Sequence, residues 1–212
     1  MLAFTLNFMR RTTCSQFISS SSEYMLPPID RIPQKIEEIT GITDEFLRNG
    51  GCDSMGIQRD PANDFKQVYS DFQAFVKDRS KDRQVAFVAH NAKFDLRMIN
   101  GELRRWRLED AATAPSLADI FSTSVDTLAL FRERKWWRSK FGRETQPPRP
   151  SSFSLSELHS HVLNESVNNA HNAIGDINAL ERLLLSDTFD GWQKTANRLQ
   201  VPFVKATKTS IA

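Results

Sequence analysis

Cysteine is scarce in this 212-residue chain, and long hydrophobic runs are missing from it. The two cysteines, Cys14 and Cys52, belong to no CxxC pair, so they provide neither a disulfide framework nor a zinc site. No run of 18 or more apolar residues is present, which excludes a membrane span. With 40% hydrophobic and 25% charged residues, the composition predicts one soluble domain in an intracellular, reducing compartment.

Acidic residues are absent from the first 22 positions. This segment contains Arg10 and Arg11, so it holds the whole net charge of +2 and the remainder sums to zero. An apolar, then basic, then Ser-rich and Thr-rich order is typical of an organelle transit peptide. Alternatively, 3–8 and 14–19 are strands, because Phe and Thr suit a half-buried sheet. We therefore separate an atypical segment at 1–22 from a domain at 23–190 and a basic tail at 191–212.

Apolar residues recur at helical spacing in the middle of the chain. Phe65, Val68, Phe72 and Val76 predict an amphipathic helix over 64–78, with Asn63 or Asp64 as N-cap. Other helices are expected over 94–107, 127–140, 154–163 and 173–186, with short helical turns over 35–48 broken at Gly41. Strands are expected at 84–89, where the run is apolar and should be buried, and at 124–126. This alternation indicates an α/β sandwich with a mainly parallel central sheet.

Two carboxylates interrupt apolar helical patterns. Asp95 follows a buried strand and a short turn, and Asp176 falls inside the apolar stripe of 173–186. Burial of a carboxylate is unfavourable unless a cation or several donors compensate its charge. Each Asp could instead cap a helix start, which requires no metal.

A histidine precedes each of these carboxylates, His90 before Asp95 and His171 before Asp176. Residues five apart lie about 140° apart on an ideal helix, so His171 can reach Asp176 only from the loop before the helix. An imidazole on a loop beside a metal-binding carboxylate suits a general base that acts on metal-bound water.

Five collinear segments resemble the DEDDh family of 3′–5′ exonucleases, which includes the proofreading epsilon subunits of bacterial DNA polymerase III. VAHNAKFD (88–95) is similar to the family's HNxxFD motif, and 171–176 is similar to its HxAxxD motif. The stretches at 27–43, 125–130 and 152–163 resemble its "ItGIt" segment, its DTL strand end and its "sL..L" helix.

The resemblance implies an RNase H-like fold, in which helices flank a mixed five-stranded sheet. It implies hydrolysis at the 3′ end of single-stranded DNA or RNA with two Mg²⁺ or Mn²⁺ ions, and a DNA polymerase as a partner. Asp95 and Asp176 would bind metal, and His171 would deprotonate the attacking water.

Four further residues receive roles from the same resemblance. His90, Asn91 and Phe94 would contact the substrate. Asp126, at the end of a strand, would cap the following helix and take no part in catalysis.

The first family motif, DxE, is missing. FTLN (4–7) aligns with the family's "fDlE" and places uncharged Thr5 and Asn7 in the acidic positions. Two carboxylates provide too few oxygens and too little charge for two hard divalent cations. Three explanations remain open. The sequence could be a shortened gene model or splice form of an active exonuclease, with its first strand truncated, or it could be a refined pseudoenzyme. It could also be a stable, inactive protein in which 1–8 fill the strand position. The competing function is a catalytically inactive nucleic-acid-binding or polymerase-associated module.

A basic segment at 132–149 has seven Arg or Lys and two Glu. Basic and aromatic residues together can hold phosphates and stack bases, and the candidates are Arg134, Lys135, Trp136, Arg138 and Lys140. Alternatively, this is a solvated helix face whose tryptophans pack on the core.

Overall fold

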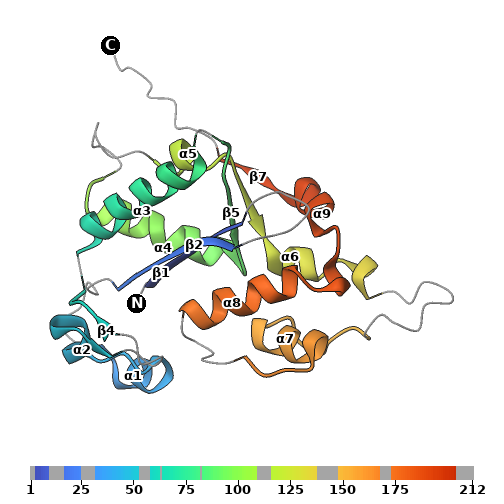
Figure 1. Cartoon of the computed structure of the whole chain (residues 1–212), viewed down its shortest axis with the longest axis horizontal. Coiled ribbons are helices and arrows are strands. Elements are labelled where there is room, and N and C mark those ends of the chain that lie inside the picture. Colours follow the sequence, from blue (N-terminus) through green and yellow to red (C-terminus); the bar gives the residue numbers. More distant parts are fainter. Residues whose placement is uncertain are drawn as a thin grey trace, which may run out of the picture. The chain divides into compact units, whose positions relative to one another are not determined.

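The computed structural model describes residues 3–9, 17–24, 32–52, 58–62, 64–81, 83–108, 116–137, 148–167 and 173–203. Figure 1 draws these residues as coloured ribbon. Two compact units contain them: the first comprises 1–72 and 132–190, and the second comprises 73–131 and 191–212. Helices and strands are mixed in the chain, which confirms the α/β class. No helix in these ranges is long and apolar enough to cross a membrane.

The first unit begins with an antiparallel pair of strands, β1 (Ala3–Met9) and β2 (Phe17–Tyr24). The prediction of a strand at 3–8 is therefore confirmed, whereas the second strand lies further along the chain than 14–19. In this register Ala3 pairs with Tyr24, and the serine-rich stretch at 19–22 forms part of β2 although serine has a weak strand propensity. Strand β1 also packs beside helix α8 (Ala173–Leu184).

Two short helices follow, α1 (Gln34–Thr40) and α2 (Asp44–Asn49), and they break where Gly41 adopts a positive φ of 68°. This confirms the predicted helical turns, because a left-handed residue that ends a helix is commonly glycine. The pair β3 (Gly51–Cys52) and β4 (Gln58–Arg59) comes next. A small apolar cluster of Ile32, Ile42 and Leu47 lies under α1 and α2.

The later part of the first unit contains helix α7 (Leu155–Leu163), which packs against α8, and the 3₁₀ turns η1 (Arg134–Trp136) and η2 (Asp187–Phe189). Helix α6 (Thr127–Phe131) ends before η1, so the prediction of one helix over 127–140 is wrong. In this turn, Trp136 and Trp137 are both buried and pack edge-on against Phe189, at ring-centroid distances of 5.5 and 5.7 Å.

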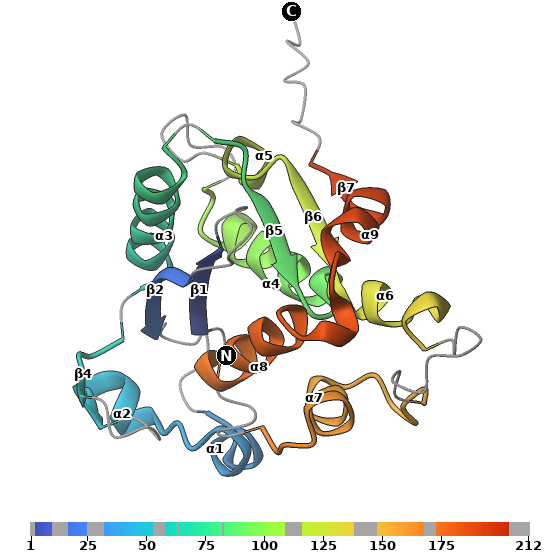
Figure 2. The ribbon, with the colours of Figure 1, turned by 45° about the vertical axis from the view of Figure 1, so that its right-hand side comes forward.

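The second unit holds a mixed three-stranded sheet. Strand β5 (Ala86–Ala89) runs parallel to β6 (Thr123–Asp126), and β7 (Val201–Pro202) is antiparallel to β6 (Figure 2). Helix α4 (Ala92–Arg105) packs along β5 and β6, and α9 (Trp192–Leu199) packs against α6 and β6. A four-residue helix, α5 (Leu117–Ile120), precedes β6. Strand β5 was predicted to be buried, but Ala86 and Val88 are exposed. The prediction of burial is therefore wrong for these two positions.

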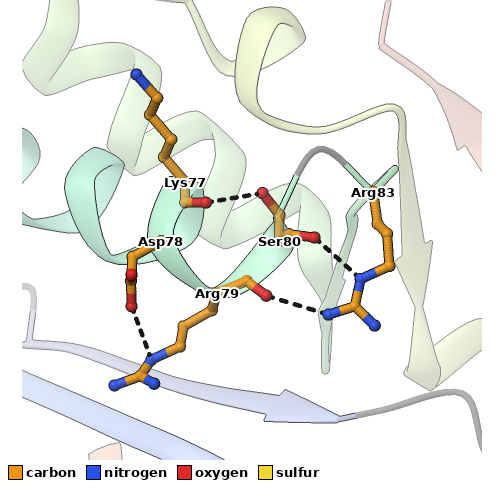
Figure 3. Close-up of polar contacts among 5 residues, drawn as sticks. All are labelled: Lys77, Asp78, Arg79, Ser80 and Arg83. Carbon is orange, nitrogen blue, oxygen red and sulfur yellow. Dashed lines mark hydrogen bonds and ion pairs between the residues drawn. The ribbon is translucent and has the colours of Figure 1, made fainter.

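Helix α3 (Phe65–Ser80) begins in the first unit and ends in the second. Asp64 caps its start as predicted, because its Oδ1 accepts the backbone N–H of Gln67 at 2.9 Å. At its end, the guanidinium of Arg83 donates to the carbonyls of Ser80 and Arg79 at 2.9 and 3.2 Å (Figure 3). These carbonyls lack partners within the helix, so the Arg83 side chain acts as its cap.

Candidate functional site

The carboxyl ends of the parallel strands β5 and β6 form the centre of the candidate site. Ala89 pairs with Asp126 in the last position of the ladder, so the residues that follow each strand emerge at the same edge. His90 and Asn91 follow β5, and Thr127 follows β6. The sheet therefore brings the HNxxFD segment and the DTL segment together, although 35 positions separate Asn91 from Asp126.

Asp126 connects the two segments through its carboxylate. Its Oδ1 accepts the backbone N–H of Leu128 at 3.0 Å, which confirms the prediction that Asp126 caps the helix beginning at Thr127. The same oxygen accepts the backbone N–H of Asn91 at 3.0 Å. Asn91 is left-handed, with φ 67° and ψ 49°, and is the N-cap of α4. The carboxylate thus holds an unfavourable backbone conformation at the start of the helix that carries Asp95.

Thr127 fixes the ring of His90. Its side chain is fully buried, and its hydroxyl donates to the carbonyl of Ala89 at 3.2 Å. The hydroxyl has one proton, so its contact with Nδ1 of His90 at 3.1 Å requires Nδ1–H as the donor. In the neutral imidazole this assigns the proton to Nδ1 and the lone pair to Nε2.

Asp95 lies in the first turn of α4, and Asn91, rather than Asp95, occupies the cap position. The capping interpretation of Asp95 is therefore wrong. Burial raises the pKa of the Asp95 carboxyl, a hydrogen bond from its backbone opposes this shift, and the negative charge of Asp126 raises the pKa further. A nearby cation would stabilise the ionised form, because it would offset both burial and repulsion.

Phe94 gives the site an exposed aromatic surface. Its side chain is 48% exposed, and the guanidinium of Arg97 lies 5.7 Å from the centre of its ring. Apolar rings of this size are usually buried, so an exposed one next to polar groups is a candidate contact surface for a ligand.

Asp176, in the first turn of α8, is partly buried and belongs to the first unit, whereas Asp95 belongs to the second. His171, Arg138 and Lys140 lie outside the described residues. Thr5 and Asn7 lie on β1 opposite Ser22 and Ser20. The residues aligned with DxE thus belong to the strand that packs beside the helix of Asp176.

In the second unit, Asp95 is the candidate ligand for a divalent cation. Mg²⁺ and Mn²⁺ prefer carboxylate and carbonyl oxygens, and the partly buried carboxylate of Asp95 offers such ligands. However, Oδ1 of Asp126 already accepts two backbone N–H groups. Among the residues described, no three His, Cys, Asp or Glu side chains form a group that could hold a metal ion.

Two tryptophans of the basic segment are buried, with 7% of Trp136 and 9% of Trp137 exposed. Nζ of Lys135 lies 4.1 Å from the centre of the Trp136 ring. Burial of the Trp136 ring does not fit the prediction that it stacks a base, and it agrees with packing of the tryptophans on the core. The helix of that alternative is not found at 134–136, where the chain forms a 3₁₀ turn. Arg134 and Lys135 are exposed, as a phosphate contact requires.

Sequence reasoning did not find the bond from Asn91 to Asp126 or the role of Thr127. A threonine directly after a strand end is the signal that could have suggested a buried, bonded hydroxyl. No protein-family model matches the chain, and no curated protein is significantly similar to it.

Proposed function

We propose that this chain is a 3′–5′ exonuclease of RNase H-like fold that hydrolyses phosphodiester bonds at nucleic-acid 3′ ends. The main support is the meeting of the HNxxFD and DTL segments at one edge of β5 and β6, where Asp95 is partly buried near the charge of Asp126. Its turnover is impaired, because Thr5 and Asn7 replace two acids of the family's first motif.

Each residue has a distinct role in this proposal. By their likeness to the family motifs, Asp95 and Asp176 would each bind Mg²⁺ or Mn²⁺, and such an ion would neutralise charge on the phosphate and lower the pKa of bound water. Phe94 presents its exposed ring to the terminal nucleoside, and Asn91 lies beside it with its backbone held by Asp126. His171 acts as general base by its likeness to the HxAxxD motif.

A second candidate is a catalytically inactive nucleic-acid-binding or polymerase-associated module. Two observations favour it: Thr5 and Asn7 carry no charge, and the described residues contain no group of three metal-ligating side chains. Such a module would retain the basic segment and bind a single strand without cutting it.

Digestion of a 3′-labelled single-stranded oligonucleotide by the whole chain separates the two candidates. With Mn²⁺ or Mg²⁺ we expect slow release of labelled mononucleotide, no release with EDTA, and loss of release in Asp95→Asn and Asp176→Asn. Asp60→Asn is the control, because it removes an exposed carboxylate elsewhere. Binding without digestion would refute the exonuclease proposal and support the module.

A further inference from the structure

Two arginines from separate segments lie against one aromatic ring in the first unit. The guanidinium carbon of Arg132 is 5.8 Å from the centroid of Phe153, and that of Arg149 is 5.2 Å from it. These two lengths limit the separation of the guanidinium carbons to about 11 Å. Arginine stacks on aromatic rings through its planar face, which leaves its N–H donors directed outward.

Buried groups hold the Phe153 ring in place. Trp137 packs edge-on against Phe153 at 6.0 Å, and Trp137 itself packs edge-on against Phe189 at 5.7 Å and His161 at 6.0 Å. Nε2 of His161 is hydrogen-bonded to the carbonyl of Pro148, the residue before Arg149. Side chains on such a support lose less conformational entropy when they bind a ligand.

Neither arginine has an acidic partner within the described ranges. The ion pairs found there join Arg79 to Asp78, Arg105 to Glu102 and Arg182 to Glu165. Arg132 and Arg149 are both exposed, as are Arg134 and Lys135 nearby in the sequence. The two positive charges, no more than about 11 Å apart, repel one another, and an anion bound between them would relieve the repulsion.

We propose that Arg132 and Arg149, supported by Phe153, form a clamp for the phosphodiester backbone of a single nucleic-acid strand. The choice of a nucleic acid as ligand rests on the proposed function. A strand carries a phosphate roughly every 3.4 Å along a helix axis, so two guanidinium groups no more than about 11 Å apart can contact the same phosphate or neighbouring ones.

Contacts of this clamp are with phosphates alone, because the adjoining Trp136 and Trp137 rings are buried. Binding should therefore be independent of base sequence. A membrane surface suits the cluster less well. The exposed large apolar side chains of the described chain, Val88, Phe94, Leu185 and Val201, all lie outside it.

The test is binding of a fluorescein-labelled oligothymidylate to the whole chain in EDTA, followed by anisotropy over a range of salt concentrations. Loss of two phosphate contacts lowers the salt slope by about 1.4, which corresponds to about 25-fold weaker binding at 0.1 M salt. We expect this loss in Arg132→Gln/Arg149→Gln. The charge-matched control is Lys77→Gln/Arg104→Gln, which removes two exposed positive charges elsewhere and should change affinity much less.

One further variant and a second ligand, phosphatidylserine vesicles, complete the experiment. Arg132→Lys/Arg149→Lys keeps the charge without the planar donors and should bind with intermediate affinity. Thermal unfolding of every variant identifies any loss of affinity that comes from misfolding. Unchanged oligonucleotide affinity in the Gln variant, or equal losses in clamp and control variants, would overturn the clamp. The clamp would also be overturned if the Gln variant lost affinity for phosphatidylserine vesicles but not for the oligonucleotide.

This experiment and the digestion assay test the clamp and the exonuclease proposal separately. If the wild-type chain digests DNA but the Gln variant binds normally, the clamp alone is wrong. If the wild-type chain digests nothing but the Gln variant loses affinity, the clamp stands and the exonuclease proposal fails. A wild-type chain that does not bind the oligonucleotide overturns the clamp directly.

Discussion

Oδ1 of Asp126 accepts the backbone N–H of Asn91 at 3.0 Å and so joins the end of β6 to the turn that follows β5. The same oxygen caps α6 through Leu128. Asp126 therefore has a structural role at the candidate site, and its charge also raises the pKa of Asp95. This arrangement separates the two carboxylates by function: Asp126 holds the backbone, and Asp95 remains the candidate ligand.

Replacement of Asp126 by Ala should lower the free energy of unfolding by about 1–3 kcal/mol, because two backbone N–H groups lose their acceptor. Asp126→Asn keeps an acceptor oxygen, so its loss of stability should be smaller. It also removes a negative charge and should lower the pKa of Asp95. Urea unfolding measures the first effect and carboxyl NMR titration the second. Equal destabilisation by Ala and Asn would contradict the assigned bonds.

Thr127→Val should destabilise the second unit and release the ring of His90. Valine keeps the shape of threonine but removes the hydroxyl, so the carbonyl of Ala89 and Nδ1 of His90 each lose their hydrogen bond with residue 127. We expect a loss of about 1–3 kcal/mol in the free energy of unfolding. Nitrogen NMR should detect the Nδ1–H tautomer of neutral His90 in the wild-type chain and a changed tautomer ratio in the variant. Thr127→Ser keeps the hydroxyl and should preserve the tautomer; a wild-type ring protonated on Nε2 would refute the assignment.

Arg83→Ala should remove the cap of α3 that Figure 3 shows. The carbonyl of Arg79 would lose its donor, whereas that of Ser80 would keep the backbone N–H of residue 83, so the free energy of unfolding should fall by about 1 kcal/mol. Arg79→Ala is the matched control. Arg79 pairs with its neighbour Asp78 on the surface, and such a pair contributes about 0–1 kcal/mol. Thermal and urea unfolding compare the two variants, and a larger loss for Arg79→Ala would exclude the capping role.

Local patterns predicted the longer elements of this fold well. Helices α3, α4, α7 and α8 each have an apolar periodicity that can be read within one segment. The short elements α5 and β7 are too brief to establish a period, so their positions depend on tertiary packing. The helix expected at 127–140 is wrong for a related reason: Trp136 and Trp137 pack on Phe189, which lies far along the chain, and no local pattern contains that contact.

The candidate site was predictable in part. The cap formed by Asp126 is local, since acceptor and donor are two residues apart, and the sequence indicated it. The bond from Asn91 to Asp126 depends on the register of β5 with β6, which no local pattern contains. The contact between the two motifs is therefore set by the pairing of β5 with β6, and neither motif alone predicts it.

Two acidic groups on the first unit, Glu165 and Glu181, should give opposite pH dependence of stability. The carboxylate of Glu165 lies 2.7 Å from Nη1 of Arg182, and its hydrogen bond with Arg182 is the main cause that lowers the pKa of Glu165 below 4.5. A lowered pKa means that the folded state favours the ionised form. The resulting stabilisation is present above pH 4.5 and disappears as the pH falls through the lowered value.

For Glu181 the sign is reversed, because burial raises its pKa above 4.5. Ionised Glu181 therefore destabilises the fold above its raised pKa, and this effect is absent below pH 4.5. Accordingly, Glu165→Gln should lower the free energy of unfolding at pH 7, and Glu181→Gln should raise it. Both differences should shrink toward low pH. Urea unfolding between pH 3 and pH 7 measures them, and a Glu181→Gln variant less stable than wild type at neutral pH would show that Glu181 makes a favourable charged contact instead.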